Sequence, residues 1–551
     1  MKKAWQRCLV FGLVALMLAS GALVRPSTAA DDKAAQERLS KDTFNAMEVI
    51  RSKYVVPVDY EPLAKAAIYG MLRTLDPHSN YFDPKSFAEM NSEHRSQYFG
   101  IGALVGSRNR HVFIVEPYKG TPAARAGLRY GDQIVMIDTK NADSWTVPQV
   151  ANALRGERGT RVRVTVERAG VAEPITVSIE RDAVALPAIP SYYLLRPGVG
   201  YIGLTRGFHS TTSDELMMVM AELKEQGANS FVLDMRGNPG GFLDQAIKVS
   251  EKFIQRGQIV VSVHGREGRY FDRELRAEAG SPETVPLVVL INGGTASASE
   301  IVAGAIQDHD RGLIVGETSF GKGLVQHIFN LSGGAGLTLT IARYYTPSGR
   351  LIQRDYSNGS FYEYIVKRSA QGDEAAASKP RTDEKFTDLG RPVFGGGGID
   401  PDIKVESSFA TTGTQNALYH GLFYFVRELT AGQVAAAPPS FKLKGIEFDH
   451  KLKPNEFLIT DEILKAYREF MHRFVREHPE FRLTPAQVDD NLPWARLQIR
   501  KEVLEAAYGS DTAQRALADL DSQVQRAVAE LPNAANLAER ARAKRSTVQL
   551  K

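Results

Sequence analysis

The 551-residue sequence contains a single cysteine, and neither sign of charge dominates it. Cys8 lies in an apolar N-terminal segment, so the chain beyond that segment has no thiol for catalysis, zinc–thiolate sites or disulfides. The 68 basic and 64 acidic residues give a net charge of +4 without a long block of one sign. This balance gives no reason to expect a nucleic-acid partner.

Metal-binding patterns are also missing. We find no group of histidine, aspartate and glutamate with metal-ligand spacing, and we therefore predict no metal and no cofactor.

The N-terminus contains the one long apolar run. Lys2, Lys3 and Arg7 precede an uncharged stretch from Cys8 to Val24, and small residues follow at Ser27-Thr-Ala-Ala30. This pattern predicts a cleaved signal peptide over residues 1–30 and export to the periplasm or cell envelope. The alternative is an uncleaved anchor, because seventeen apolar residues are at the short edge of a spanning helix.

Changes of periodicity divide the rest of the chain. Helical spacing indicates a helical region over 31–96, short β runs with two helices indicate a compact module over 97–185, and helical patterns return over 409–551. In the last region two apolar stripes are expected to pack on the body of the protein or on a partner copy: Ile463, Tyr467, Phe470, Met471, Phe474 and Val475, and then Leu517, Leu520, Val524, Val528 and Leu531.

Between residues 186 and 408 strands alternate with helices. The strand patterns include Val199–Leu204, Phe231–Asp234, Gln258–Ser262 and Pro286–Ile291. Repeated βα units predict an α/β core with a largely parallel sheet. A polar excursion is expected near residues 354–398.

Ser297 stands out in the run Asn292-Gly-Gly-Thr-Ala-Ser-Ala-Ser-Glu300, between a strand pattern and a helix pattern. An α/β fold exposes a nucleophile in such a position, although the run does not match G-x-S-x-G. The amide of Ala298, at the helix start, and that of Gly241, in a glycine-rich strand end, are candidates for an oxyanion hole. The equally weighted alternative is that Ser297 and Ser299 are helix caps.

Lys322, in Gly316-Glu-Thr-Ser-Phe-Gly-Lys-Gly323, is a candidate general base. It would have to be neutral, which burial or a neighbouring cation favours. Gln326 would lie on the same face of the following strand and could orient the amine. The segment also resembles the start of a phosphate-binding loop, but Gly323 replaces the magnesium-binding Ser or Thr and a strand pattern follows.

A Ser-His-Asp site is the competing hypothesis, with His209, His309 or His327 as the base. No specific motif surrounds any of the three. Alternation along the strand also points His327 away from the face that carries Gln326.

In the β-rich module, Phe99-Gly-Ile-Gly102 precedes a strand pattern. A loop containing Gly100, Ile101 and Gly102 can present consecutive amides to a terminal carboxylate, while the next strand pairs with a peptide. A simple tight turn is the alternative.

Taken together and in this order, these segments resemble the carboxyl-terminal processing peptidases, in which a PDZ domain is inserted into a serine-lysine protease. The matching stretches are Gly70–Tyr81, Gly100–Gly102, Gly120–Asp132, Asp234–Gly241, Thr295–Glu300, Phe320–Gly323 and Tyr344–Gly349.

The resemblance implies Ser297 as nucleophile, Lys322 as base, Gln326 as its partner, and the Gly241 and Ala298 amides as the oxyanion hole. It also implies supporting roles for Glu300 and Asp308, and protein substrates with free, apolar C-termini. An adaptor and a homo-oligomer stay open, as does a binding-only alternative: a catalytically idle PDZ scaffold, or a relative that binds lipophilic ligands.

Overall fold

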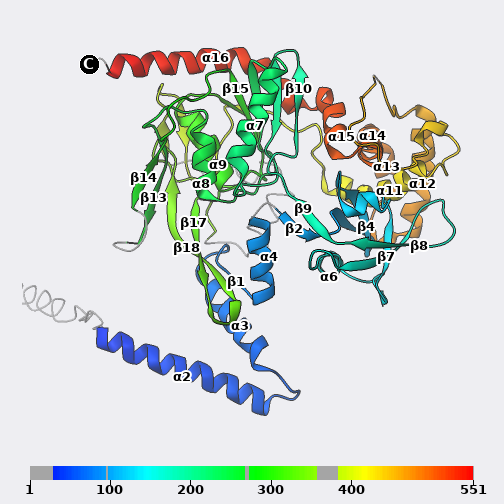
Figure 1. Ribbon diagram of the computed structural model, residues 1–551, viewed down its shortest axis with the longest axis horizontal. Helices are drawn as coiled ribbons and strands as arrows, with labels where there is room; N and C mark the ends of the chain where they lie inside the picture. The colour runs from blue at the N-terminus through cyan, green and yellow to red at the C-terminus, as the bar shows by residue number, and fades with distance from the viewer. Residues whose placement is uncertain (1–28, 95–96, 267–271, 357–382, 454, 550–551) are drawn as a thin grey trace, which may run out of the picture. The chain divides into compact units, whose positions relative to one another are not determined.

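The computed structural model describes residues 29–94, 97–266, 272–356, 383–453 and 455–549 (Figure 1). Residues 1–28, most of the predicted signal peptide, lie outside this range. No helix within the described ranges combines the length and the apolar character needed to cross a membrane.

Contacts divide the chain into two compact units, residues 1–76 and 77–551. The first unit contains helices α2 (Ala29–Lys53) and α3 (Tyr60–Arg73). These helices account for the helical spacing seen between Leu39 and Leu75. The boundary falls at Asp76-Pro77, where that spacing ends, since a residue before proline is disfavoured in a helix.

The second unit begins with β1 (Asn80–Phe82) and α4 (Pro84–His94), followed by a β-rich module. The module consists of β2 (Gln97–Gly100), β3 (Ala103–Arg108), β4 (His111–Pro117), α5 (Pro122–Arg125), β5 (Gln133–Ile137), β6 (Lys140–Asn141), α6 (Val147–Leu154), β7 (Arg161–Glu167), β8 (Ile175–Glu180) and β9 (Asp182–Ala185). Its main sheet has the order β3-β4-β5-β7-β8, and β2 pairs with β9. Alternate residues of these strands form its own hydrophobic core, for example Val112 and Ile114 on β4.

The core of the protein is a six-stranded sheet. Its strands are, in spatial order, β10 (Ser191–Arg196), β11 (Val199–Gly203), β12 (Ser230–Asp234), β15 (Leu287–Ile291), β16 (Leu313–Gly316) and β21 (Ile403–Lys404). All neighbours from β11 to β21 are parallel, and only β10 is antiparallel. The central strands β12 and β15 are buried along their whole length, as expected when both faces of a sheet are covered. The predicted α/β core is confirmed.

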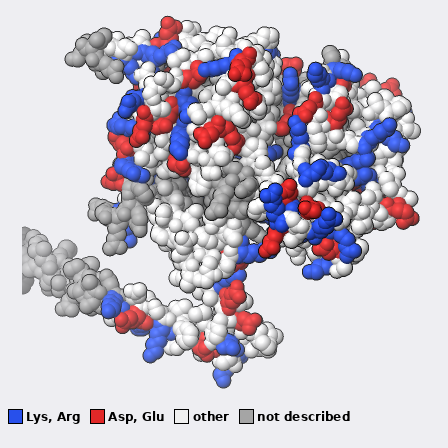
Figure 2. Space-filling view, viewed as in Figure 1, with Lys and Arg blue, Asp and Glu red and all other residues white. Residues whose placement is uncertain are grey.

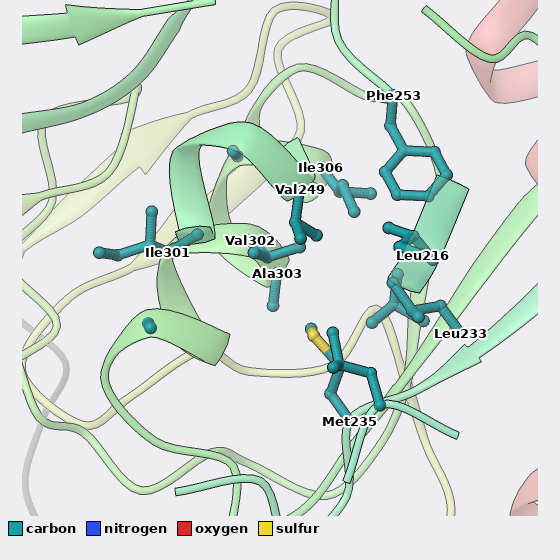
Figure 3. Packing of buried hydrophobic residues seen from close by; sticks show 14 of the residues in the cluster. Leu216, Leu233, Met235, Val249, Phe253, Ile301, Val302, Ala303 and Ile306 are labelled. Carbon is teal, nitrogen blue, oxygen red and sulfur yellow. The ribbon is translucent and has the colours of Figure 1, made fainter. Parts of the chain in front are cut away.

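Three helices cover one face of this sheet: α7 (Thr212–Glu225), α8 (Leu243–Ser250) and α9 (Ala298–Asp308). Figure 3 shows Leu216 of α7, Val249 of α8 and Val302 of α9 in the same cluster of buried side chains as Leu233 of β12. All residues of α9 are buried, so the helix that begins after Ser297 is firmly fixed against the sheet.

A second sheet differs from the sequence-based expectation. The segment Gln258–Ser262 fitted the βα alternation, but β13 (Ile259–Gly265) pairs antiparallel with β14 (Arg273–Arg276) and β18 (Gly336–Tyr345). β17 (Leu324–Asn330) and β1 also pair with β18. Exposed and buried residues alternate at the end of β13, which suits an antiparallel sheet with one solvated face.

The excursion after residue 354 is described only from residue 383 onward, where β19 (Glu384–Phe386) and β20 (Pro392–Phe394) form a hairpin. The helices that follow are α11 (Gly413–Thr430), α12 (Asp461–Glu477), α13 (Pro485–Asp490), α14 (Leu492–Tyr508), α15 (Ser510–Leu517) and α16 (Ser522–Gln549).

The two apolar stripes of this extension are used differently. The stripe on α12 packs against α11 and α14, as its spacing predicts. The second stripe is interrupted: Leu517 lies on α15, Leu520 is 44% exposed, and Val524 and Leu531 of α16 pack on the face of the parallel sheet opposite α9. Packing on the body is therefore correct for Val524, Val528 and Leu531 of the second stripe, whereas the first stripe packs mainly within the extension. Figure 1 shows α16 beside β15.

The extension also contacts the β-rich module. Phe113 and Tyr130 of the module share a hydrophobic cluster with α11 and α14, and the Tyr130 hydroxyl donates to Glu502 at 2.5 Å. Arg427 of α11 donates to the carbonyls of Gly131 and Glu167 at 2.6 and 2.7 Å.

On the face in Figure 2, basic and acidic side chains are interspersed, in keeping with the small net charge.

Candidate active site

Ser297 lies in the turn between β15 and α9, at the N-cap of α9. Its backbone has φ 55° and ψ −115°, a region that non-glycine residues rarely occupy and that costs about 1–3 kcal/mol. A helix cap ordinarily has extended backbone instead. Ser297 and Glu300 form a capping box, as the cap alternative predicts. The strained backbone is a feature that a simple cap does not need, and it favours an additional role of Ser297 as the nucleophile.

Lys322 and Gln326 lie on the loop after β16 and on β17. The Lys322 Nζ donates to the Gln326 Oε1 at 2.9 Å, and the Gln326 Nε2 in turn donates to the carbonyl oxygen of His78. Both side chains are half-buried. The side-chain amide of Gln326 therefore fixes the position of the Lys322 amine. The His78 carbonyl, in the segment before β1, in turn fixes the position of Gln326.

Glu300 connects the serine and lysine segments. Its fully buried carboxylate accepts the amides of Ser297 at 2.8 Å and Lys322 at 2.9 Å through Oε2, and the amide of Gly321 at 2.7 Å and the hydroxyl of Ser319 through Oε1. Burial raises the pKa of Glu300, while these donors act in the opposite direction.

The Gly240-Gly241 segment runs directly beside Ser297. A Cβ on Gly240 would lie 2.8 Å from the Ser297 Cβ and 2.9 Å from the Ala298 nitrogen, and a Cβ on Gly241 would lie 2.2 Å from the carbonyl oxygen of Phe208. Both positions therefore require glycine. Gly241 and Phe208 form a parallel bridge that uses the Gly240 carbonyl and the Phe242 amide, so the Gly241 amide points away from Phe208.

A cavity of about 810 Å³ joins these groups. Ser297, Ala298, Gly241, Lys322 and Gln326 all line it. Much of the remaining wall is apolar and comes from α8, α9 and the second sheet: Ile247, Val263, Leu275, Ile301, Leu324 and Ile341. The structure thus brings all five predicted catalytic and oxyanion-hole residues to one pocket.

Asp308 lies apart from this pocket. It is at the C-terminal end of α9, ten positions after Ala298, and the helical rise of about 1.5 Å per residue separates it from the N-terminal end by about 15 Å. Its buried carboxylate pairs with Arg350 at 2.7 Å and accepts the Ser348 amide. Its predicted supporting role therefore corresponds to the packing of α9.

The phosphate-loop and Ser-His-Asp interpretations fit the geometry less well than the Ser-Lys site does. β17 follows Lys322 as a strand, so there is no helix N-terminus to receive a phosphate. His309 follows the last residue of α9 and contacts Asp388 and the Ile259 carbonyl, and His209 contacts the Leu186 carbonyl. His327 lines the same cavity as Ser297 from β17, where its ring lies 4.8 Å from the ring of Phe329 and no carboxylate in the described part of the chain pairs with it. Within the described ranges, no group of three or more potential ligands could hold a metal.

One residue at the site had no local sequence signal. The hydroxyl of Tyr344, on β18, lies 3.0 Å from the Ser297 carbonyl oxygen and 2.6 Å from the Lys322 carbonyl oxygen. Tyr344 occurs in a stretch that carries the family resemblance, but a buried strand tyrosine looks like any core residue. Only the pairing of β18 with β17 and β13 brings it here.

Comparisons with known proteins identify the family of this chain. Residues 198–358 match the model of peptidase family S41, residues 113–168 match the PDZ domain, and residues 19–86 match the N-terminal domain of the activating protease CtpB. A carboxy-terminal-processing protease of Bartonella bacilliformis is 40% identical over 56% of this chain and 70% of its own length. The chain belongs to peptidase family S41.

This S41 protein is a serine-type carboxy-terminal processing protease with a PDZ domain. Carboxy-terminal processing protease CtpA of Bacillus subtilis is 36% identical over 56% of this chain and 66% of its own length. Among solved structures, the photosystem II D1 C-terminal processing protease is 29% identical and covers 66% of this chain and 86% of its own, with a TM-score of 0.36.

In the PDZ domain of this S41 protease, the predicted carboxylate loop joins β2 to β3. The carbonyls of Ile101 and Gly102 accept the amides of Ala123 and Tyr118 at 2.7 and 2.9 Å, which fixes the backbone of the loop. The Ile101 side chain is buried in the domain core, so only its backbone could contact a peptide, whereas Phe99 is 38% exposed. Gly100 packs against Tyr98.

Proposed function

We propose that this protease is exported, captures the C-terminal tail of substrate proteins with its PDZ domain, and cleaves them through a Ser297-Lys322 acyl-enzyme mechanism. The observation that carries the proposal is the 2.9 Å hydrogen bond from Lys322 Nζ to Gln326 Oε1, in a cavity that Ser297 also lines.

In the first step, neutral Lys322 takes the proton of the Ser297 hydroxyl while the oxygen attacks the scissile carbonyl carbon. The resulting oxyanion accepts hydrogen bonds from the amides of Gly241 and Ala298. Protonated Lys322 then gives its proton to the departing amine, which leaves an ester on Ser297. Water, activated by the same amine, hydrolyses that ester and regenerates the serine.

Gln326 suits this mechanism better than a carboxylate would. Its Oε1 accepts a hydrogen bond from the lysine amine in both charge states. A carboxylate at the same distance would favour the protonated amine and would remove the base. The neutral amide orients Lys322 without adding an opposing charge.

Substrate selection follows from the PDZ domain and the cavity. Strand β3 offers an edge to which an extended tail can add, next to the Gly100–Gly102 loop for the terminal carboxylate. The apolar wall formed by Ile247, Leu275 and Ile341 favours apolar side chains near the cleaved bond. Export is supported by the charged N-terminus and the apolar run from Cys8 to Val24.

The mechanism is tested with the full-length protein and a substrate protein that ends in an apolar tail. Ser297→Ala and Lys322→Ala should each lower kcat/KM by about 10³-fold or more while binding of a tail peptide is retained. Ser299→Ala is the matched control, because Ser299 lies two residues away on the same helix and its hydroxyl donates to the Asn238 carbonyl at 3.1 Å. Wild-type turnover in Lys322→Ala would refute the mechanism.

Export is tested separately. Cell fractionation and N-terminal sequencing of the purified protein should find it in the envelope with a new N-terminus near residue 30. Recovery from the cytosol with Met1 in place would refute export.

A further inference from the structure

Tyr344 contacts the backbones of both the predicted nucleophile and the predicted base. Its ring is 1% exposed, and its hydroxyl lies between the carbonyl oxygens of Lys322, at 2.6 Å, and Ser297, at 3.0 Å. A phenol carries one proton, so the two carbonyls share it and the nearer Lys322 oxygen takes the stronger bond. Its own amide also donates to the Gly323 carbonyl at 3.0 Å.

The contacts of Tyr344 complement those of Glu300. Glu300 accepts the amides of Ser297 and Lys322, and Tyr344 donates toward the carbonyls of the same two residues. In each of the two residues, the amide is thereby bound by Glu300 and the carbonyl by Tyr344. Glu300 belongs to α9, whereas Tyr344 belongs to β18 of the second sheet.

This arrangement matters because the Ser297 turn and the Lys322 loop are far apart along the chain. Helix α9, strand β16 and part of the following loop lie between them. Ser297 also has a strained backbone that its surroundings must maintain. Without the Tyr344 hydroxyl, Glu300 would still tie the amides together, and the Ser297 carbonyl would still accept the amides of Glu300 and Ile301 at 2.8 and 3.1 Å. The Lys322 carbonyl would lose its 2.6 Å bond to β18, and the loop of the base would lose its direct link to the Ser297 turn through the phenol. The positions of the serine oxygen and the lysine amine relative to each other would then be less well defined.

We propose that Tyr344 is a positioning residue of the protease, whose hydroxyl fixes the register between the Ser297 turn and the Lys322 loop. The inference rests on the proposed Ser-Lys mechanism. Tyr344 acts through the backbones of these residues, since its hydroxyl hydrogen-bonds to their carbonyls and not to their side chains. A misplacement of about 1 Å between reacting groups is enough to cost about 100-fold in rate.

The test compares Tyr344→Phe with Tyr345→Phe in the full-length protein. Phe keeps the buried ring and removes only the hydroxyl. Tyr345 is the next residue on the same strand, is half-buried, and places its ring 5.1 Å from the ring of His264. Four quantities are measured: kcat and KM on an apolar-tailed substrate, the labelling rate of Ser297 by a fluorophosphonate, and the Kd of a tail peptide.

For Tyr344→Phe we expect kcat and the labelling rate to fall together by about 10–100-fold, with KM and the peptide Kd within about threefold of wild type. Tyr345→Phe should stay within about twofold on all measures. A purely structural role would lower the melting temperature but leave both rates unchanged per folded molecule, so all rates are divided by the folded fraction from circular dichroism.

Two failures are distinguishable. If Ser297→Ala abolishes labelling and Tyr344→Phe is labelled at the wild-type rate, the inference is wrong and the Ser-Lys mechanism stands. If Ser297→Ala still cleaves substrate, the proposed mechanism fails and the inference fails with it.

Discussion

The Oε2 atom of Glu300 accepts the backbone amide of Lys322 at 2.9 Å, although the two residues are 22 positions apart. The same atom accepts the amide of Ser297. One carboxylate oxygen thus places the nucleophile turn and the loop of the base side by side.

Glu300→Gln should disrupt the site although the side chains are nearly isosteric. All four groups around the Glu300 carboxylate are hydrogen-bond donors. The side-chain nitrogen of the introduced glutamine, itself a donor, would therefore face two of these donors in either orientation. We expect a loss of about 2–4 kcal/mol in the free energy of unfolding and of at least about 100-fold in kcat/KM.

The matched control is Glu317→Gln, in the same loop. One oxygen of Glu317 accepts both the Ser407 amide and the Gln523 side chain, and a glutamine retains such an oxygen. Equal losses in the two variants would contradict a special role for Glu300. Urea unfolding and steady-state kinetics supply both measurements.

Gln326→Glu should shift the pH dependence of the protease. A carboxylate beside the Lys322 amine favours the protonated amine, so the rising limb of kcat/KM should move upward by about 1–3 pH units. Gln326→Ala removes the acceptor without adding charge and should lower the rate with a much smaller shift. A rising limb at the wild-type pH in Gln326→Glu would argue against Lys322 as the base.

Asp308→Ala should affect stability and not the chemistry. Breaking its buried pair with Arg350 leaves an uncompensated charge and should cost about 3–5 kcal/mol in the free energy of unfolding. The exposed Arg161–Glu180 pair is the control, and Glu180→Ala should cost about 1 kcal/mol or less. Activity per folded molecule should persist in Asp308→Ala; a selective loss of kcat would assign this residue to the site after all.

Gly102→Ala should weaken tail binding by the PDZ domain. Gly102 has φ 77°, and a Cβ there would lie 2.4 Å from Thr121, so the carboxylate loop has to move. Gly159→Ala is matched because Gly159 has φ 82° in the same domain with open space around it. We expect at least about a tenfold rise in the Kd of an apolar-tailed peptide for Gly102→Ala only. Fluorescence anisotropy measures both, and equal Kd values would contradict the assignment of this loop.

The contact between the PDZ domain and α14 should weaken as pH rises. Burial raises the pKa of Glu505; Glu502 and Glu116 act in the same direction, and Lys501 opposes them. A raised pKa means that the folded state prefers the protonated carboxyl. Its stabilising contribution is therefore complete below about pH 4.5, the pKa of an unperturbed Glu, and is lost as pH rises through the higher folded value.

Glu505→Gln removes this titration. The melting temperature of the variant relative to wild type should rise between pH 5 and pH 8, as measured by differential scanning calorimetry. A difference that stays constant over that range would show that Glu505 does not titrate as proposed.

Local patterns predicted much of this protein. The buried runs of β12 and β15 and the helical spacing of α9 are continuous in the sequence, so short-range periodicity is enough to identify them. The sheet to which Gln258–Ser262 belongs is not predictable in this way, because a short apolar strand has the same pattern in a parallel sheet and in the antiparallel sheet that β13 joins.

By itself the sequence determined which reactive groups are present: a serine, a lysine and an amide, with no cysteine beyond Cys8, and a module that can hold a chain end. These are properties of residue types and of segments a few residues long. The tertiary structure decided which groups meet, namely that Glu300 binds the amides and Tyr344 the carbonyls of Ser297 and Lys322. Such contacts join residues that are far apart along the chain, and only the packing of two sheets and a helix brings them within hydrogen-bonding distance.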